Sequence, residues 1–434
     1  MRDYKALYQK KRTTPEAVAA HVRSGQRVFA DIALAQPRAI ISALDERVRS
    51  GAISDVCLST LMDLYPMACY QQDAPPGLEG ISLFCGAGAR QGVNAGHGDI
   101  LPGYYRDFPD IIRRHREAHV FCAAVSPMDE KGFFSLGTVS SVSEALLEKA
   151  DVVLLEVNER VPYTYGVPSV HISQVTALCE NNMPLLCLPA EEPDEISRTI
   201  GGLIAQEVCD GATLQLGIGA IPDAVGLALR DKRNLGIHTE MFTASMVELL
   251  ECGAADNSRK PIHRGCSVAT FVFGSQRIYD YVDHNRAFQL LPVNYVNDPA
   301  VIARHPHFVS VNAALEVDFF GQVCAESIGT YQISGTGGQA DYVRGAVLSP
   351  GGQSFIAFPS TAKGGTVSRI VPTLTPGAIV TTSKNDVDNI VTEYGIARLR
   401  GRTLRERTEN LIAIAHPRFR DELRYAARQR NILV

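Results

Sequence analysis

The sequence contains two copies of one supersecondary pattern, and this internal repeat constrains the fold more than any other feature. Residues 21–28 (HVRSGQRV) resemble residues 207–214 (EVCDGATL); the first copy continues to Pro37 and the second to Pro222. Each copy reads as a helix, a glycine turn, a strand and a second helix that opens near proline, a residue favoured in the first turn of a helix. Because self-similarity marks a structural unit that is used twice, the chain is predicted to hold two related domains.

Apolar runs rich in β-branched residues alternate with helical stretches, and residues 152–155, 184–188 and 378–382 are predicted as strands. Continuous apolar strands are buried on both faces, which is typical of parallel sheets covered by helices. The predicted fold class is therefore α/β. The 434 residues exceed one ordinary core. We place the domains at 1–190 and 191–434, dividing the chain in an acidic, proline-rich stretch.

Composition and charge exclude several classes of function. A net charge of −5 leaves no basic footprint for nucleic acid. No run approaches the roughly 18–20 apolar residues that span a bilayer. The ten cysteines form no Cys-x-x-Cys pair, which favours reduced thiols in a cytoplasmic protein. His115 and His119 stand four apart but lack a third ligand, so no metal site is predicted.

The first candidate motif is a strand that runs into a glycine-rich turn and a helix at residues 216–225. Gly217 and Gly219 allow the backbone to approach a ligand, and a helix N-terminus presents free N–H groups to anionic or polar groups. A plain tight turn explains the same letters. The third spaced glycine of a dinucleotide fingerprint is absent, which disfavours a Rossmann dehydrogenase.

The second motif places Glu240 just beyond a short apolar strand, in the stretch GIHTEMF at 236–242. Ligands collect at the carboxyl ends of strands in α/β domains. A glutamate there can attack a thioester and split the exchange of CoA into easier covalent steps. From the local sequence alone, a solvated glutamate at a helix start is the favoured alternative.

The third motif, SGTGGQADY at 334–342, has three glycines in four residues, so that consecutive N–H groups can converge on an oxyanion. A β-turn with a bulge is an equal alternative. Lys363 is a candidate for a phosphate or carboxylate contact, and Glu393 for orienting an acid substrate. Either residue alone is more often surface charge.

Together these motifs resemble the acetyl-CoA hydrolase/transferase family, the glutamate-dependent CoA-transferases that include acetate, butyrate and 4-hydroxybutyrate CoA-transferases. The resemblance covers nearly the whole chain and begins at about residue 25. Its most specific stretches lie in the C-terminal half, at residues 236–242, 291–299, 334–342, 354–363, 392–401 and 414–417.

The resemblance implies a role for each candidate. Glu240 matches the nucleophile, and the Gly338 N–H matches a donor that helps to form the oxyanion hole and touches CoA. Asn312 and Glu393 match residues that line the acyl pocket. The implied CoA-binding residues are Gly217, Ile218, Gly219, Ala220, Ile221, Gly338 and Lys363.

The implied activity is exchange of CoA between an acyl-CoA and a short-chain carboxylate, by a ping-pong mechanism through a glutamyl-CoA thioester on Glu240. The implied fold is a tandem pair of open α/β CoA-transferase domains with the active site in the cleft between them. Acyl-CoA is then a substrate, no cofactor is permanently bound, and the protein is a homodimer or homotetramer. Two alternatives stay open: an acyl-CoA hydrolase on the same scaffold, and a non-catalytic acyl-CoA-binding protein.

The acid itself is not determined by these motifs. Acetate, butyrate and 4-hydroxybutyrate are the acids of the family members that the motifs resemble. Gln36, Arg38 and the polar stretch 93–99 are predicted to favour a polar or dicarboxylic acid such as succinate or itaconate.

Overall fold

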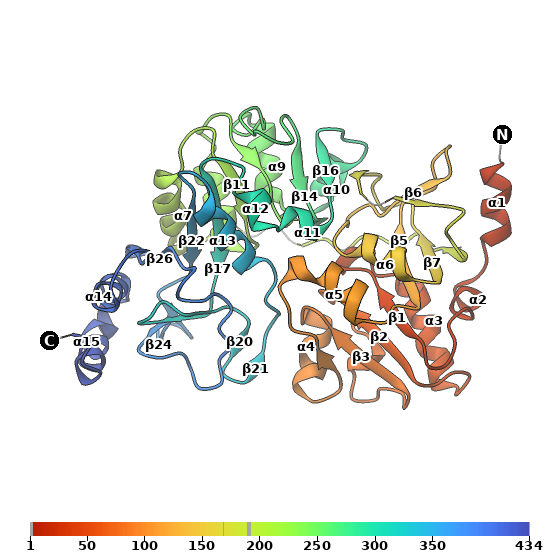
Figure 1. Ribbon diagram of the computed structural model, residues 1–434, viewed down its shortest axis with the longest axis horizontal. Helices are drawn as coiled ribbons and strands as arrows, with labels where there is room; N and C mark the ends of the chain where they lie inside the picture. Colours follow the sequence, from red (N-terminus) through yellow and green to blue (C-terminus); the bar gives the residue numbers. More distant parts are fainter. Residues whose placement is uncertain (1–2, 168, 189–191, 434) are drawn as a thin grey trace. The chain divides into compact units, whose positions relative to one another are not determined.

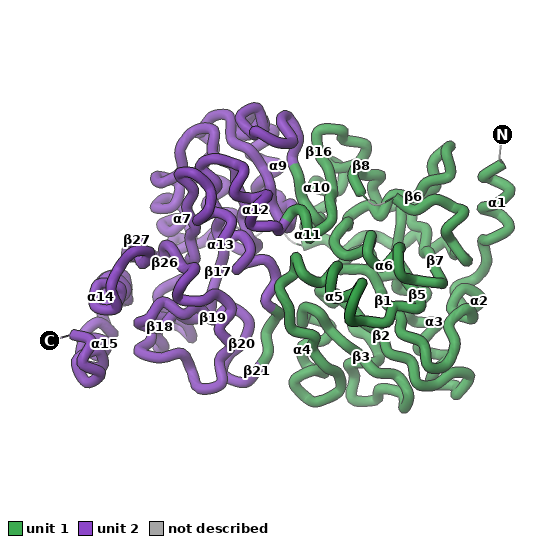
Figure 2. The backbone as a smooth tube through the Cα atoms, in the orientation of Figure 1, with its two compact units in different colours: residues 1–189, 268–296, 332–335 green, residues 190–267, 297–331, 336–434 purple. Residues whose placement is uncertain are grey.

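The computed structural model describes residues 3–167, 169–188 and 192–433 and divides the chain into two compact units (Figures 1 and 2). Unit 1 comprises residues 1–189, 268–296 and 332–335. Unit 2 comprises residues 190–267, 297–331 and 336–434. Two segments from the second half of the sequence thus belong to unit 1. The single domain boundary at about residue 190 stays a prediction.

Unit 1 is built around a seven-stranded sheet whose strand pairings are all parallel (Figure 1). In spatial order its strands are β10 (Ala177–Glu180), β7 (Val152–Val157), β5 (Val120–Val125), β1 (Arg27–Ala30), β2 (Val56–Thr60), β3 (Leu78–Ser82) and β4 (Asp99–Ile100). Its helices are α1 (Tyr4–Lys11), α2 (Pro15–Ala19), α3 (Arg38–Arg49), α4 (Ala87–Asn94), α5 (Phe108–His115), α6 (Ser143–Lys149), α10 (Gln276–Val282) and α11 (Val293–Val296).

One face of this sheet forms a continuous core with the helices that cover it. Alternate residues of the central strands, such as Val28 of β1 and Val120 of β5, pack with Val18 of α2 and Leu44 of α3. All six residues of β5 are buried, so its other face is covered as well. This is the arrangement expected of parallel strands, and it confirms the α/β class and the strand predicted at 152–155.

Unit 2 holds a six-stranded sheet that is parallel except for its last strand. Its order is β12 (Gly236–Ile237), β11 (Thr213–Leu216), β17 (Phe308–Ala313), β22 (Gln353–Ala357), β26 (Asn389–Thr392) and the antiparallel β27 (Gly395–Arg398). Its helices are α7 (Glu195–Glu207), α8 (Ala220–Ala228), α9 (Ala244–Glu251), α12 (Pro299–Ile302), α13 (Gln339–Leu348), α14 (Leu404–Ile414) and α15 (Arg420–Gln429).

The strand order of unit 2 reverses between β11 and β17. After β11 the chain first adds β12 on one side and then adds β17, β22 and β26 on the other. In open α/β sheets, ligands bind outside the carboxyl ends of the strands at such a switch point. The residues that follow β11 and end β17 therefore lie where a ligand is expected.

The two copies of the repeat fold alike. Gly25 precedes β1 with a φ of 80°, and Gly211 precedes β11 with a φ of 79°. This left-handed conformation favours glycine because it has no Cβ. Pro37 caps the N-terminus of α3, and Pro222 lies in the first turn of α8. The copies differ in a short 3₁₀ turn, η1 (Ala33–Ala35), which only the first contains between its strand and helix.

The strand prediction is wrong for two of the three apolar runs. Residues 184–188 form no strand, and Leu186 and Leu188 are 38% and 42% exposed. In the run 378–382, Thr382 makes only an isolated bridge, and Ile379 is 40% exposed. An apolar run becomes a buried strand only where a neighbouring strand takes its backbone hydrogen bonds. Within the part of the chain that the structure describes, neither run has such a neighbour along its length.

None of the helices within the described ranges is long and apolar enough to cross a membrane. All ten cysteines are free thiols, and the exposed ones are Cys187, Cys209 and Cys252. The other seven are buried, where a thiol behaves as a small apolar side chain. Short two- and three-stranded sheets complete both units. Among them, β18 (Glu316–Asp318) pairs with β25 (Ile370–Val371), and β23 (Thr361–Ala362) pairs with β24 (Val367–Ser368).

Candidate active site

Glu240 lies just beyond the carboxyl end of the edge strand β12. The residue keeps partial exposure, but its carboxyl group is surrounded by protein atoms. Asn297 donates a hydrogen bond of 2.6 Å from its Nδ2 to Glu240 Oε2. Burial raises the pKa of the Glu240 carboxyl group to about 7, and the bond from Asn297 opposes part of the rise. A carboxyl group with a pKa near neutrality is typical of a functional site.

The missing side chain of Gly338 makes room for this carboxyl group. A Cβ atom at position 338 would lie 1.9 Å from Glu240 Oε2 and 2.4 Å from Asn297 Nδ2. Both distances are shorter than any non-bonded contact allows. The backbone of Gly338, with φ −99° and ψ 5°, does not itself demand glycine. A side chain at 338 would therefore displace the Glu240 carboxyl group, and the two sequence motifs meet in space.

The backbone at Gly338 also begins helix α13. Gly338 is the N-cap residue, and no side chain caps the N-terminus. Gly337 has a φ of 57°, so successive N–H groups of this turn face the same side, as they do in anion-binding nests. The end of a helix adds a partial positive charge. A negative charge that develops on an oxygen beside Glu240 would be stabilised here.

The carboxyl ends of β11 and β17 are joined by a pair of amide side chains. Gln215 Nε2 donates to Asn312 Oδ1 at 3.3 Å, and Asn312 Nδ2 donates to Gln215 Oε1 at 3.2 Å. The N–H of Gly217 donates to the carbonyl of Val311 at 2.9 Å. Asn312 and the glycine turn are thus neighbours at the switch point of the sheet.

The glycine turn is open to solvent above the N-terminus of α8. Gly219 is the N-cap residue with a φ of 106°, and a Cβ added there would meet no atom within 4 Å. Ile218 is 52% exposed, which is unusual for an apolar side chain in a turn. Ala220 and Ile221 open the helix, and Ile221 is buried. The turn presents backbone and an apolar side chain together, as contact with a large ligand would require.

Helix α13 connects these two parts of the site. Gln339, its first residue, donates from Nε2 to the carbonyl of Ala313 at 2.7 Å. Ala313 follows Asn312 at the end of β17. Glu240, Gly338, Asn312 and the turn after β11 therefore share the carboxyl edge of the unit 2 sheet.

Glu393 occupies the hairpin turn between β26 and β27. The Ser360 N–H donates to Glu393 Oε2 at 2.8 Å, and the Ser360 hydroxyl donates to Oε1. The described hydrogen bonds of Glu393 hold the end of β26 against the segment after β22; none of them joins it to Glu240. Lys363 is exposed in the turn between β23 and β24 with a φ of 49°. These two predicted residues lie on the same unit, and their roles at the site stay predictions.

Two site residues were missed by sequence reasoning. Asn297 lies in the stretch 291–299, and Gln215 lies inside the strand before the glycine turn, but neither was named as a candidate. A buried amide has no signature in sequence until its partner is known. Asn297 is fully buried, and its Oδ1 makes no hydrogen bond within the described residues. Its side chain is thus turned to use its donor on Glu240.

The residues expected to tune the choice of acid belong to unit 1. Gln36 is buried and donates to Asp63 Oδ1 at 3.4 Å. The guanidinium of Arg38 lies 4.3 Å from the centre of the Tyr65 ring. Asn94 ends helix α4. Their effect on the acid stays a prediction.

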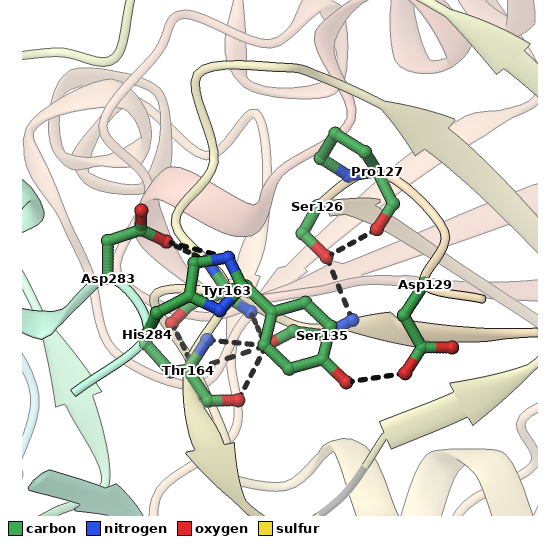
Figure 3. Close-up of polar contacts among 9 residues, drawn as sticks. Ser126, Pro127, Asp129, Ser135, Tyr163, Thr164, Asp283 and His284 are labelled. Carbon is green, nitrogen blue, oxygen red and sulfur yellow. Dashed lines mark hydrogen bonds and ion pairs between the residues drawn. The ribbon is translucent and has the colours of Figure 1, made fainter. Parts of the chain in front are cut away.

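Unit 1 also has a cavity of about 500 Å³ near Tyr163. Figure 3 shows the polar contacts around this tyrosine. The Tyr163 hydroxyl donates to Asp129 Oδ2 at 3.0 Å, its N–H donates to Asp283 Oδ1 at 2.7 Å, and its ring stacks on His284 with centroids 5.1 Å apart. These groups satisfy one another and brace the surrounding loops. None of the predicted site residues lines this cavity, and we do not assign it a reaction.

Comparison with known proteins identifies the family of the chain. Residues 1–187 match the acetyl-CoA hydrolase/transferase N-terminal domain, and residues 274–427 match the C-terminal domain of the same family. A succinyl-CoA:cyclohexane-1-carboxylate CoA transferase of Geobacter metallireducens is 43% identical over 99% of this chain and 98% of its own length. A 4-hydroxybutyrate coenzyme A transferase of Clostridium kluyveri is 40% identical over 97% and 98%.

Among solved structures, RipA from Yersinia pestis superimposes with a TM-score of 0.94 at 36% identity, and each chain is covered completely. Both halves of the chain match the family, and relatives above 30% identity span nearly all of it. The predicted resemblance is confirmed: the chain belongs to the acetyl-CoA hydrolase/transferase family.

Proposed function

We propose that this protein is a CoA-transferase that exchanges CoA between an acyl-CoA and a short-chain carboxylate through a thioester on Glu240. The observation that carries the proposal is the enclosed Glu240 carboxyl group, which bonds to Asn297 and occupies the space that a side chain at 338 would fill. The transferase names of the two relatives support the same class of reaction.

The first half-reaction loads CoA onto the enzyme. A carboxylate oxygen of Glu240 attacks the thioester carbonyl, the carbon–sulfur bond breaks, and CoA leaves as the thiolate. The product is a mixed anhydride between the acyl group and Glu240. The thiolate then attacks the glutamyl carbonyl of this anhydride, which releases the first acid as its carboxylate and leaves glutamyl-CoA.

The second half-reaction reverses these steps with a second acid. Its carboxylate attacks glutamyl-CoA and expels the thiolate, and the thiolate then attacks the new acyl carbonyl and frees Glu240. No proton or redox equivalent is consumed. Each attack places negative charge on a carbonyl oxygen, and the N–H groups at Gly338 and the start of α13 are the donors that we assign to it.

The environment of Glu240 suits a nucleophile. A carboxylate with a pKa of about 7 is more basic than one in water and is still substantially ionised at neutral pH. Asn297 donates to one oxygen only and lets the other approach the substrate. We propose that the turn Gly217 to Ile221 receives CoA, since it combines open backbone with the exposed Ile218.

We propose acids of the 4-hydroxybutyrate, butyrate and acetate type as substrates, with succinate and itaconate as dicarboxylic candidates. One methylene in an acyl pocket is worth only ~1–3 kcal/mol, so that the acid has to be measured. The cytoplasmic location and the homodimeric or homotetrameric state stay predictions.

An acyl-CoA hydrolase is the second candidate. The family description includes hydrolases, and the two reactions differ only in whether water reaches the intermediate on the enclosed Glu240 carboxyl group. In a hydrolase, water in place of the second acid would resolve the covalent intermediate. The same active-site groups would serve both reactions.

A mass-spectrometric exchange assay decides between them. The purified protein is given acetyl-, butyryl- and succinyl-CoA, each with a panel of free acids, and every acyl-CoA formed is recorded beside free CoA. New acyl-CoA without much free CoA establishes the transferase and ranks its acids. Free CoA that accumulates with every acid establishes the hydrolase, and CoA binding with no acyl exchange establishes a non-catalytic binding protein.

The covalent step has its own test. Incubation with acyl-CoA and no second acid should leave one CoA on the protein, and peptide mapping should locate it at Glu240. Glu240→Ala should lose both the adduct and the exchange. Glu240→Asp tests placement: it should lose transfer, because its carboxylate is withdrawn by one methylene, while a water-mediated hydrolysis persists. Exchange that survives in Glu240→Ala would refute the mechanism.

A further inference from the structure

The strand that leads to Glu240 is an edge strand with two outward-facing backbone groups. β12 pairs only with β11 in its sheet, with Leu214 opposite Ile237. The N–H groups of Gly236 and His238 donate inward to that neighbour, at 2.8 and 3.1 Å. In a parallel ladder the residue between them points its N–H and its carbonyl the other way. Ile237 is fully buried, so both groups need partners there.

Two side chains from the following loop supply these partners. Asn257 Oδ1 accepts the N–H of Ile237 at 2.8 Å, and Lys260 Nζ donates to the carbonyl of Ile237 at 2.8 Å. Lys260 Nζ also donates to the carbonyl of Cys266 at 2.6 Å. Asn257 is held in turn by the bond from its Nδ2 to Ser267 Oγ at 3.0 Å. Together, Asn257 and Lys260 replace the missing strand neighbour.

The stem of Lys260 is fitted closely to the strand. A Cβ at Gly236 would lie 2.7 Å from Lys260 Cγ and 3.0 Å from its Cδ, so this glycine leaves the path of the lysine open. Lys260 is only 2% exposed. Among the described residues, its hydrogen-bond partners are two neutral carbonyls and no carboxylate.

A lysine in such surroundings is costly. Burial lowers the pKa of Lys260 to about 7, which reflects how poorly the site solvates a charge. An apolar side chain of the same length would avoid this cost, but it would leave the carbonyls of Ile237 and Cys266 without this donor. The bond from Lys260 to Ile237 lies three residues before Glu240, on the strand that leads to the nucleophile.

We propose that Lys260, together with Asn257, is a positioning residue: it holds the end of β12 so that Glu240 meets Asn297 and Gly338 in the reactive geometry. The inference rests on the proposed function of Glu240. Without Lys260, the buried carbonyl of Ile237 loses its donor and the strand end moves to find another. A displacement of about 1 Å at a reacting group can cost ~10²-fold in rate.

The test is Lys260→Met, which keeps the length of the stem and removes the donors. The matched control is Lys149→Met in unit 1, because Lys149 Nζ also donates to two backbone carbonyls, those of Ile112 at 2.7 Å and Arg113 at 3.0 Å. For both variants we measure kcat, the KM for acyl-CoA and the thermal midpoint, with rates normalised to folded protein.

We expect Lys260→Met to lower kcat by about 10- to 100-fold, with the KM for acyl-CoA changed by less than about twofold. The rate of adduct formation on Glu240 in a single turnover should fall by the same factor. Lys149→Met should keep kcat. If Lys260→Met keeps kcat within about twofold, whatever its thermal midpoint, Lys260 is merely structural and the inference is overturned.

Two further variants keep the test decisive. If Lys260→Met does not fold, Lys260→Gln retains a donor group on a shorter side chain and should fold with a reduced kcat; an unchanged kcat in that variant also overturns the inference. Glu240→Ala is assayed beside them. Exchange in Glu240→Ala refutes the proposed function, whereas an inactive Glu240→Ala together with a fully active Lys260→Met refutes only the positioning role.

Discussion

Gly338→Ala is the substitution that most directly tests the geometry of the site. The new Cβ would lie 1.9 Å from Glu240 Oε2, about 1.5 Å closer than the 3.4 Å at which ordinary contact begins. It would also lie 2.4 Å from Asn297 Nδ2, so the hydrogen-bonded pair would have to move as a unit. Alanine adopts a φ of −99° without strain, and the backbone should therefore stay in place.

The size of the effect follows from this displacement. A carboxylate that is shifted by more than 1 Å loses its alignment with the thioester, and such a misplacement costs ~10²-fold. This factor corresponds to about 2.7 kcal/mol of transition-state stabilisation at ~1.36 kcal/mol for each factor of ten. Overpacking should also reduce the stability of the fold by ~1–3 kcal/mol.

Gly345→Ala is the matched control for that loss of stability. Gly345 lies in the same helix, α13, and its added Cβ would meet Ile302 Cγ2 at 2.5 Å and Cβ at 2.6 Å. The overpacking is similar, but it does not involve Glu240. The exchange assay should show kcat reduced about a hundredfold in Gly338→Ala and nearly unchanged per folded molecule in Gly345→Ala.

The reasoning fails if Gly338→Ala retains full kcat, since its methyl group cannot share space with the Glu240 carboxyl group in the observed position. It also fails if both variants lose kcat to the same extent, because the loss would then come from disturbing the helix. A crystal structure of Gly338→Ala should show the carboxylate moved away from residue 338.

Three further results are expected. Because the ionised form of Glu240 attacks, kcat/KM should rise with pH through about 7. Asn297→Ala removes a donor worth ~1.5–3 kcal/mol and should move this inflection up by about one to two units; an unmoved inflection would contradict the role of Asn297. The pKa of the Glu240 carboxyl group in the folded protein exceeds its ordinary value of 4.5, so the free energy of unfolding falls as pH rises from about 4.5 to 7. Glu240→Gln should therefore have a higher thermal midpoint than the unmodified protein at pH 8, and this difference should disappear below about pH 4.5. Gly202→Ala in α7 should stabilise the fold by ~0.5–1 kcal/mol, because its added Cβ meets nothing within 4 Å. Gly201→Ala should destabilise the fold, because its added Cβ would lie 2.7 Å from the Ala224 carbonyl carbon. Chemical denaturation measures both changes, and equal effects would refute the packing of α7 on α8.

Local features of the sequence predicted much of the fold. Gly25 and Gly211 have nearly the same positive φ, a conformation that glycine adopts more readily than other residues because it has no Cβ. Pro37 and Pro222 open helices for an equally local reason. The repeat, the α/β class and the family can therefore be predicted from the sequence. The order of the strands in each sheet cannot be predicted in this way, since it depends on contacts between segments that are distant in sequence.

Apolar content alone did not predict which runs form strands, because a strand also needs a neighbouring strand to take its backbone hydrogen bonds. The run at 152–155 became the buried strand β7, whereas the runs at 184–188 and 378–382 did not become strands. Only β7 has a strand on each side, β5 and β10, to take its backbone hydrogen bonds.

By itself, the sequence determined the family, the repeat and the identity of the candidate nucleophile, because motifs and backbone preferences are properties of short segments. The tertiary structure alone decided what surrounds that nucleophile. Folding brings Asn297 and Gly338, which are distant in sequence, against the Glu240 carboxyl group. Folding also brings Lys260, which lies in a loop, against the strand that leads to Glu240. The pKa of Glu240 follows from that burial, and burial is a property of the packed fold.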